Sequence, residues 1–430
     1  MKILIQNGRV IDPRSGLDQT CDIALAAGRI VGVNRVPPEF APSRTIDASG
    51  CIVLPGLVDL AARLREPGHE HEGMLESEMA AAVAGGVTSL VCPPDTDPVL
   101  DEPGLVEMLK FRAEKLHQSR LFPLGALTRG LAGEVLTEMA ELTESGCVGF
   151  GQADVPLAST QVLQRALQYA ATFGYTVWLR PQEMHLGKGV AASGPLATRL
   201  GLSSVPVAAE TIALHTIFEL LKTTGARVHL CRLSSAAGVE LLRRAKADGL
   251  NVTADVSINS LHLTDVDIGF FDSRARLSPP LRQQRDRDAL SAALADGTID
   301  ALVSDHTPVD EDEKTLPFAE AEPGATGLEL LLSLALKWSQ DSGVPLARAL
   351  AVVTAEPARV LGGALGTLQA SVGQIVEGGV GDLCILDPQA AWTVEGAQLA
   401  SQGKQTPFSG YELPGRVRTT LVGGQVAFDR

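Results

Sequence analysis

The loop PGHEHEG contains the side chains best suited, by type and spacing, to hold a metal ion. His69 and His71 form an H-x-H pair, which can present two imidazole nitrogens to zinc. Glu70 and Glu72 lie in the same loop. Because polar residues are common in any exposed loop beyond a strand, we interpret the two histidines as surface residues, with metal ligation as the alternative.

Charged residues near the ends of apolar runs form a second group. Arg63, Arg180 and Arg232 lie in LVDLAARL, YTVWLRP and ARVHLCRL, and Asp305 follows ALVS. A guanidinium cannot ligate a metal, but it forms strong charge-assisted hydrogen bonds with carboxylates. We therefore predict a salt bridge from Asp305 to one or more of the three arginines, with an anion bound among the arginines as the alternative. The neighbouring His306 is interpreted as a local hydrogen-bonding residue.

Two further features are interpreted without a chemical role. Cys231 adjoins Arg232, whose charge favours a thiolate, but no paired base is evident, and we interpret Cys231 as a buried structural thiol. The six cysteines include no C-x-x-C pair, so neither a zinc knuckle nor a disulfide framework is indicated. The acidic run from Asp310 to Lys314 is interpreted as a solvated loop.

Composition excludes several classes of function. The chain has 36 Lys and Arg against 51 Asp and Glu, a formal net charge of -15, which argues against binding the phosphate backbone of nucleic acid. The N-terminus becomes polar too soon for a signal peptide, and the most apolar later run, Leu328 to Trp338, is about half of a membrane span. We predict a cytoplasmic protein that binds no nucleic acid and no membrane.

The elements that must position these residues follow a βα alternation. The stretch from Leu54 to Asp101 reads as a strand, a loop, an Ala-rich helix and a second strand. Eight such apolar runs with intervening helices predict a (β/α)8 TIM-type barrel over residues 55–365. The β-branched runs in residues 1–54 and 366–430 are expected to complete one small β-sandwich, because neither end has enough strands alone.

Several motifs in this order resemble a known family. GLVDLAARLREPG, AGGVTSLVCPPDTDPVLD, LVSDHTP, TAEPARVLG and GDLCILDP are similar to segments of the dihydroorotase branch of the amidohydrolase superfamily. The resemblance covers essentially the whole chain, including the split sandwich. It implies a barrel mouth in which active members bind one or two zinc ions, which activate water for the reversible hydrolysis of dihydroorotate to carbamoyl aspartate.

The resemblance also implies that the zinc ligands are lost. Four positions where the family has metal-ligating histidines hold residues that cannot bind zinc, namely Ala61, Arg63, Arg180 and Arg232. Where strand four of the family supplies an Asp or a carbamylated Lys, this chain has Gly151-Gln152-Ala153. Only the strand-eight acid, Asp305, remains. One carboxylate among three guanidiniums cannot hold a dication, so we expect zinc to be absent and Asp305 to be a vestige of the catalytic base.

The substrate contacts that the family implies are changed as well. Arg65 matches the carboxylate-binding arginine and is retained, whereas the partner Asn of the family is Asp95 here. Another family Asn is Ser278, and a family His is Val309. We therefore expect Arg65, Asp95 and Ser278 to be vestigial substrate-binding positions.

These residues predict a catalytically inactive dihydroorotase homologue. Similar proteins that lack the ligands act as non-catalytic structural or assembly subunits for aspartate carbamoyltransferase in pyrimidine biosynthesis, so the resemblance implies that partner, in a homo-oligomer such as a dimer or in a hetero-oligomer. The alternative is an active cyclic amidohydrolase that is metal-independent or uses His69 and His71. A barrel that senses an anion among the arginines is the third hypothesis.

Overall fold

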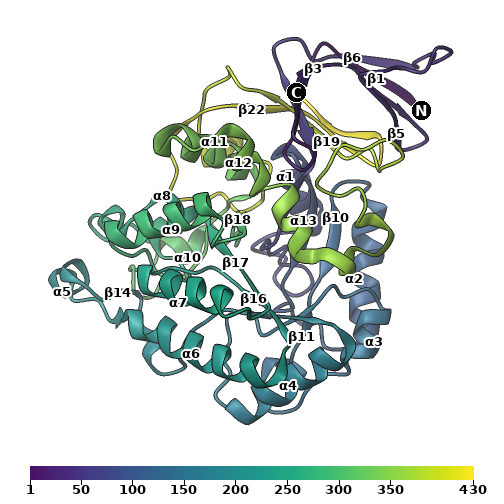
Figure 1. Cartoon of the computed structure of the whole chain (residues 1–430). Coiled ribbons are helices and arrows are strands. Elements are labelled where there is room, and N and C mark those ends of the chain that lie inside the picture. Colours follow the sequence, from purple (N-terminus) through teal and green to yellow (C-terminus); the bar gives the residue numbers. More distant parts are fainter.

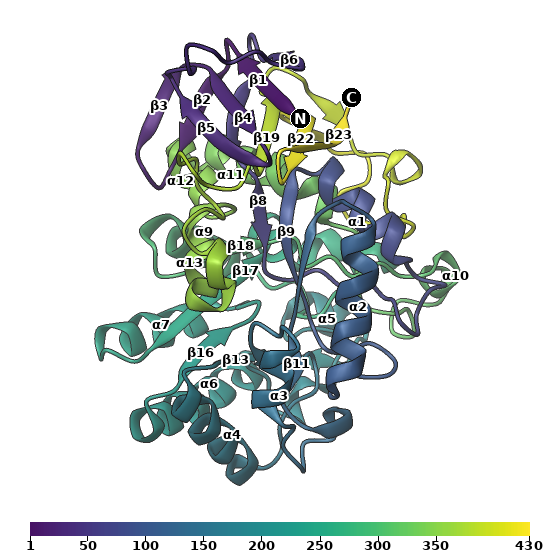
Figure 2. The ribbon, with the colours of Figure 1, turned by 90° about the vertical axis from the view of Figure 1, so that its right-hand side faces the viewer.

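The computed structural model describes residues 1–430 and contains a barrel with a smaller all-β part beside it (Figure 1). Both chain ends lie in the β part, where Figure 2 shows their strands together. A four-stranded sheet there has the order β5-β4-β1-β6. Its strands are β1 (Lys2–Gln6), β4 (Ile23–Ala26), β5 (Arg29–Val33) and β6 (Arg44–Asp47).

A second sheet joins the two ends of the chain in the order β23-β22-β19-β7-β2-β3. The start of the chain supplies β2 (Arg9–Asp12), β3 (Leu17–Thr20) and β7 (Ile52–Pro55). The end supplies β19 (Leu383–Asp387), β22 (Arg416–Val422) and β23 (Gln425–Asp429). Apolar side chains of both sheets pack into one small core, for example Ile3, Leu25, Val53 and Ile385. The predicted sandwich therefore forms, because each sheet buries its apolar face against the other.

The barrel is a closed ring of eight parallel strands. The third is interrupted at Leu124, so β10 and β11 are two pieces of one strand. The ring is closed by parallel pairing of Ala62 with His306. In order, the strands are β8 (Leu57–Asp59), β9 (Val87–Cys92), β10 (Arg120–Pro123) with β11 (Gly125–Ala126), β12 (Phe150–Gly151), β13 (Thr176–Leu179), β16 (Arg227–Leu230), β17 (Val252–Ser257) and β18 (Ala301–Val303). The predicted (β/α)8 fold is confirmed.

Helices surround the barrel because their apolar stripes face the strands. In α4, for instance, Leu163, Ala166, Leu167 and Ala170 are buried, and Ser159 caps the first turn through the backbone N–H of Val162. The longer helices are α1 (Leu75–Ala84), α2 (Pro103–Lys115), α4 (Thr160–Phe173), α6 (Val207–Thr224), α7 (Ala236–Ala247), α9 (Gln284–Asp296) and α11 (Leu331–Ser342). Shorter helices are α3 (Met139–Glu144), α5 (Pro195–Leu200), α8 (Ile258–His262), α10 (Glu311–Thr315), α12 (Leu346–Ala351) and α13 (Ala355–Leu361).

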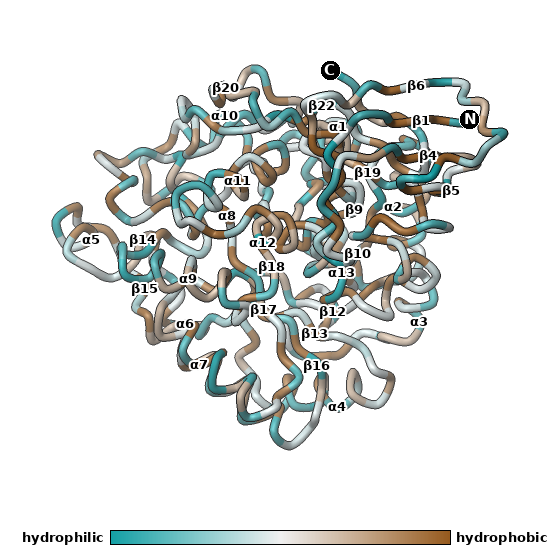
Figure 3. Tube along the Cα trace, turned by 45° about the horizontal axis from the view of Figure 1, so that its top comes forward, coloured by the Kyte–Doolittle hydropathy of each residue, from teal (hydrophilic) through white to brown (hydrophobic).

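Four two-residue strands lie outside the main sheets: β14 (Ala191–Ala192) with β15 (Ser204–Val205), and β20 (Trp392–Thr393) with β21 (Glu412–Leu413). Hydrophobic colour in Figure 3 follows buried strands such as β9 and β19, and hydrophilic colour is concentrated on outer loops. Every residue of β9 and β13 is buried, as expected for parallel strands covered on both faces. No helix has both the length and the apolar character needed to cross a membrane.

Candidate functional site

The barrel brings the predicted charged residues together at one mouth. Arg180 directly follows β13, and Arg63, Arg232 and Asp305 lie just beyond β8, β16 and β18. All strands are parallel, so their carboxyl ends meet at the same face. The three arginine side chains and the Asp305 side chain are each 10% or less exposed. They are therefore largely removed from water and need partners.

Asp154, which the sequence analysis did not select, is the common partner of the three arginines. Its Oδ2 lies 3.1 Å from Nη2 of Arg63, and its Oδ1 lies 3.3 Å from Nη1 of Arg180. Arg232 Nη2 donates to the same Oδ1. Burial alone would raise the pKa of the Asp154 carboxyl, but the charges of Arg232, Arg63 and Arg180 outweigh it and hold that pKa well below its usual range. Asp154 is therefore a carboxylate at the centre of the mouth.

Two more carboxylates complete the cluster. Asp305 accepts a hydrogen bond from Arg232 Nη1 at 3.1 Å, so the predicted ion pair of Asp305 forms with Arg232. Arg63 instead donates from Nε to Asp95 Oδ2 at 2.8 Å. Three guanidiniums thus face three carboxylates, and their formal charges cancel. This balance disfavours the alternative in which surplus positive charge binds an anion.

The mouth has little free volume. The cavity lined by Arg63, Asp154, Arg232, Ser278 and Asp305 measures about 10 Å³. A deeper cavity of about 40 Å³ is lined by the small residues Ala61 and Ala153 with neighbours that include Trp178 and Cys231. Such spaces admit single water molecules rather than a six-membered cyclic amide.

Arg65 is also engaged within the chain. Its Nε lies 2.5 Å from Oε2 of the buried Glu72 and donates to the carbonyl of Pro308 at 2.8 Å. Nη2 donates to Glu322 Oε1 at 3.4 Å. Ser278 contributes its backbone carbonyl, which accepts from Arg232 Nη1 at 3.2 Å. The expected substrate-binding positions Arg65, Asp95 and Ser278 therefore all bond to other parts of the protein.

The histidines of the loop 69–71 and His306 lie where the sequence predicted, on the surface and in a hydrogen-bond network respectively. His69 and His71 lie on an exposed loop, with side chains 36% and 61% exposed, and both rings face Glu72. His306 is fully buried, and its Nδ1 accepts the backbone N–H of Gly327 at 3.1 Å. Its Nε2 must then carry the proton, which it donates to Glu78 Oε2 at 2.7 Å. His306 is confirmed as a hydrogen-bonding residue that joins the end of β18 to α1.

Comparison with known proteins agrees with this fold. The chain matches the family model described as "Dihydro-orotase-like" over residues 50–237 and the "Amidohydrolase family" model over residues 199–427. It is 45% identical over 427 residues to a "Dihydroorotase-like protein" of Pseudomonas putida, with 99% of each chain covered. The chain belongs to the dihydroorotase-like amidohydrolase family.

Other relatives and a solved structure extend the match. A "Dihydroorotase" of Geobacter sp. is 39% identical, with 100% of this chain and 99% of that protein covered. The structure of "L-Hydantoinase (Dihydropyrimidinase) from Arthrobacter aurescens" has a TM-score of 0.86 at 25% identity, covering 99% of this chain and 96% of that one. The amidohydrolase fold thus spans the entire chain.

The mouth of this dihydroorotase-like chain does not fit the zinc that its family implies. At the positions where the resemblance implies histidine ligands, the mouth holds Ala61 and the three arginines, and the carboxylates of Asp154 and Asp305 are bonded to guanidiniums. Guanidiniums offer no lone pair and repel a dication. The donor set at the mouth is therefore that of an ion-pair network.

One other group has metal-ligating residue types, His229, Cys231 and Asp255, whose ligand atoms lie within 4.8 Å of one another. His229 uses both ring nitrogens, with Thr253 Oγ1 at 2.8 Å and Asp255 Oδ2 at 2.9 Å. Asp255 Oδ1 accepts the backbone N–H of Arg232 at 2.7 Å. A cation would have to displace these bonds. Cys231 was predicted to be buried but is only partly buried, unlike the other five cysteines. Desolvation nevertheless raises the pKa of its thiol well above the ordinary value, as expected for an unreactive thiol.

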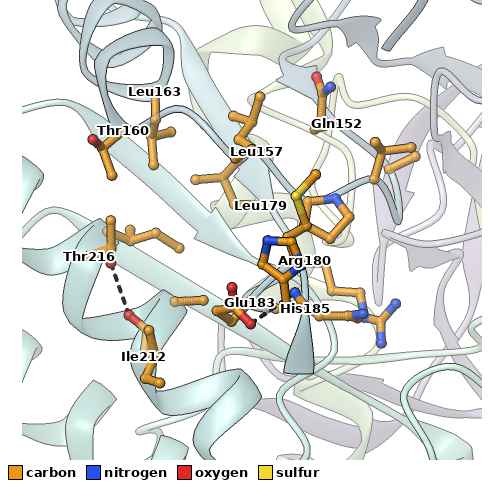
Figure 4. Close-up of a pocket in the computed structure, with 18 residues that line it drawn as sticks. Gln152, Leu157, Thr160, Leu163, Leu179, Arg180, Glu183, His185, Ile212 and Thr216 are labelled. Atoms are coloured by element: carbon orange, nitrogen blue, oxygen red, sulfur yellow. Dashed lines mark hydrogen bonds between the residues drawn. The ribbon is translucent and has the colours of Figure 1, made fainter. Parts of the chain in front are cut away.

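A further cavity lies beside the mouth and was not anticipated. It measures about 250 Å³ and lies between α4 and α6 at the end of β13 (Figure 4). Its walls are mostly apolar and include Leu157, Leu163, Leu179 and Ile212. No motif in the sequence indicates it, because its lining comes from separate segments that only the fold brings together.

Proposed function

We propose that this chain is a catalytically inactive dihydroorotase homologue that acts as a non-catalytic structural and assembly subunit for aspartate carbamoyltransferase in pyrimidine biosynthesis. The observation that carries the proposal is the convergence of Arg63, Arg180 and Arg232 on Asp154. Hydrolysis of a cyclic amide at neutral pH needs a nucleophile stronger than free water, which a metal provides by lowering the pKa of bound water to about 7. An arginine network supplies no such nucleophile.

The surroundings of this network support the loss of catalysis. The mouth cavities of about 10 and 40 Å³ leave no room for a substrate ring. Arg65, which resembles the substrate-carboxylate contact of the family, is neutralised by the buried Glu72. With no metal-bound water beside it, Asp305 has nothing to deprotonate, and its bond to Arg232 gives it a structural role instead.

The barrel nevertheless keeps its full set of strands, helices and buried apolar residues. A fold that is maintained while its reaction centre is replaced suits a protein used for its surface. Assembly with the carbamoyltransferase would take place in the cytoplasm, a reducing compartment that suits six unpaired cysteines.

The second candidate is an active cyclic amidohydrolase with an unusual metal site or none. It is favoured by the relatives named "Dihydroorotase", which match this chain over its full length at 39% identity. The group His229, Cys231 and Asp255 would be its metal ligands if their present hydrogen bonds were exchanged.

Two measurements on purified protein separate these candidates. Elemental analysis after expression in zinc-supplemented medium should give well below one zinc per chain, and hydrolysis of dihydroorotate should stay at the blank rate with added Zn²⁺. Stoichiometric zinc together with turnover would overturn the proposal. An Arg63→Ala variant serves as a control for contamination. If a contaminating enzyme causes the hydrolysis, the rate will be the same in preparations of the natural chain and of the variant.

Assembly is tested by mixing the chain with aspartate carbamoyltransferase of the same organism and measuring the mass by light scattering after gel filtration. We expect one complex that contains both proteins. A carbamoyltransferase that keeps its own mass and its full activity with or without this chain would contradict the assembly role.

A further inference from the structure

An exposed apolar patch lies on the loop between α8 and α9. Val266 is 68% exposed, Phe270 89% and Phe271 38%. The two phenylalanine rings meet edge to face, with centroids 5.3 Å apart. Only 4% of the residues of this chain are aromatic, so two adjacent exposed phenylalanines are conspicuous. Apolar side chains gathered on a surface mark places where another molecule binds.

The backbone beneath these side chains is firmly held. Thr264 donates its N–H to Asp267 Oδ2 at 2.7 Å, and Asp272 donates its N–H to the carbonyl of Ile268 at 2.9 Å. Ile268 and Ala275 are buried beneath the patch. Because the loop is already ordered, a partner that covers the phenylalanines would lose little conformational entropy on binding.

The loop that contains α10 packs beside this patch through Lys314. The buried Lys314 donates from Nζ to the carbonyls of Ser273 and Arg276 at 3.2 and 3.1 Å. The loop from 264 to 276 follows β17 and the loop from 310 to 316 follows β18, so both belong to the mouth face. Figure 2 shows α10 at the outer edge of the barrel, where a partner can reach it.

The Asp272–Arg274 ion pair next to Phe271 is neutral and Arg276 is partly buried, whereas the neighbouring segment 310–313 is acidic. Asp310, Glu311, Asp312 and Glu313 form no ion pair within the chain, and Lys314 is engaged with backbone carbonyls. Four unpaired carboxylates next to an apolar patch favour a partner whose own apolar recess is edged with lysine or arginine. They disfavour an anionic membrane surface, and they disfavour a second copy of this acidic chain, whose net charge is -15.

We infer that Val266, Phe270, Phe271 and the carboxylates of residues 310–313 form a docking patch for a folded protein with an apolar recess and a basic rim. The inference rests on the assembly role proposed above and specifies the surface that would perform it. Phe270 and Phe271 enter the recess of the partner, and the acidic residues pair with its rim. Binding therefore weakens as salt rises.

The test uses the full-length chain, tagged and expressed in its native host. Gel filtration of the lysate gives the size of the complex, and mass spectrometry identifies its members. The variant Phe270→Ser/Phe271→Ser should weaken association about 30-fold or more, as expected when central aromatic anchors are removed. The charge reversal Glu311→Arg/Asp312→Arg should also weaken it and should reduce its salt dependence.

A matched control replaces Met108 and Phe111 by Ser on α2, where they are 39% and 58% exposed. This control should leave the complex intact. A thermal melting curve confirms that all variants are folded, which is expected because the replaced side chains are on the surface. A photo-crosslinking amino acid at position 270 should join a partner peptide that is apolar and flanked by lysine or arginine.

The outcomes separate this inference from the proposed function. A complex that lacks aspartate carbamoyltransferase but is lost in the phenylalanine variant removes the proposed function and keeps the docking patch. A complex that survives both patch variants overturns the docking patch, whatever the partner is. The docking patch is equally refuted if the chain runs alone, binds only its own copies, or sediments with membranes.

Discussion

Replacing Asp154 by Asn tests whether this carboxylate holds the mouth together. The substitution keeps the shape of the side chain but leaves three buried guanidiniums without their shared anion. Removing one partner from a buried ion pair costs about 3–5 kcal/mol. Asp154 is 33% exposed while its partners are 10% or less exposed, so water compensates part of the loss and we expect about 3 kcal/mol.

The free energy of unfolding is measured by urea denaturation at pH 7, followed by far-UV circular dichroism. A loss of about 3 kcal/mol raises the equilibrium constant for unfolding about a hundredfold, in favour of the unfolded state. Asp312→Asn is the control, because Asp312 is exposed and has no ion pair, and it should change stability by less than about 0.5 kcal/mol.

The variant also makes a prediction about anions. Asp154→Asn leaves three arginines against Asp95 and Asp305, a surplus of one positive charge. Chloride, an anion not much larger than a water molecule, should then raise the melting temperature of the variant more than that of the natural protein. If Asp154→Asn is as stable as the natural chain and responds equally to chloride, the central role assigned to Asp154 is wrong.

Three other predictions follow from the charged and titratable groups. The pKa of Asp154 is lowered in the folded chain, so its stabilisation is complete above the pKa of an unfolded Asp, about 4, and is lost progressively as the pH falls below that value. In acid-unfolding curves, the stabilities of the natural protein and Asp154→Asn should therefore begin to converge below about pH 4. Burial raises the pKa of Glu329 to about 7, so the unfolded chain releases the proton of this carboxyl at a lower pH than the folded chain does. The free energy of unfolding should therefore decline from about pH 4.5 to 7. The variant Glu329→Gln should remove the corresponding decline in melting temperature. Cys231 should not react with a thiol reagent at pH 8 until urea unfolds the chain; fast labelling of the native protein at Cys231, located by mass spectrometry, would contradict its inert role.

The fold and much of the mouth could be predicted because both depend on periodic patterns. Alternation of apolar strands and helices indicates a barrel, and parallel strands bring their carboxyl ends together, which places Arg63, Arg180, Arg232 and Asp305 at one face. Asp154 could not be predicted in this way. Asp154 lies one residue beyond the expected ligand position. Ala153, directly before it, has a φ of 49°, and this local turn of the backbone cannot be read from the periodicity of the strand. The one available signal was an acid three residues after the end of the strand, in GFGQAD.

The pairing of Arg65 was hidden for a different reason. Glu72 is close to it in sequence, but Glu322 reaches it from a loop more than two hundred residues away, and a long-range ion pair leaves no mark on local composition. The exposed phenylalanines did leave a mark, since GFFD is an aromatic pair in an otherwise polar turn. Their exposure, however, depends on Ile268 and Ala275 occupying the buried side of the loop.

The shared carboxylate of Asp154 also constrains how this chain can evolve. Placing a histidine at position 63, 180 or 232 removes one cation from a balanced cluster, because a neutral imidazole replaces a guanidinium. Each such replacement therefore leaves buried aspartates short of partners and lowers stability. Substitutions on the surface of the barrel carry no such cost, so the mouth is expected to vary less freely than the surface.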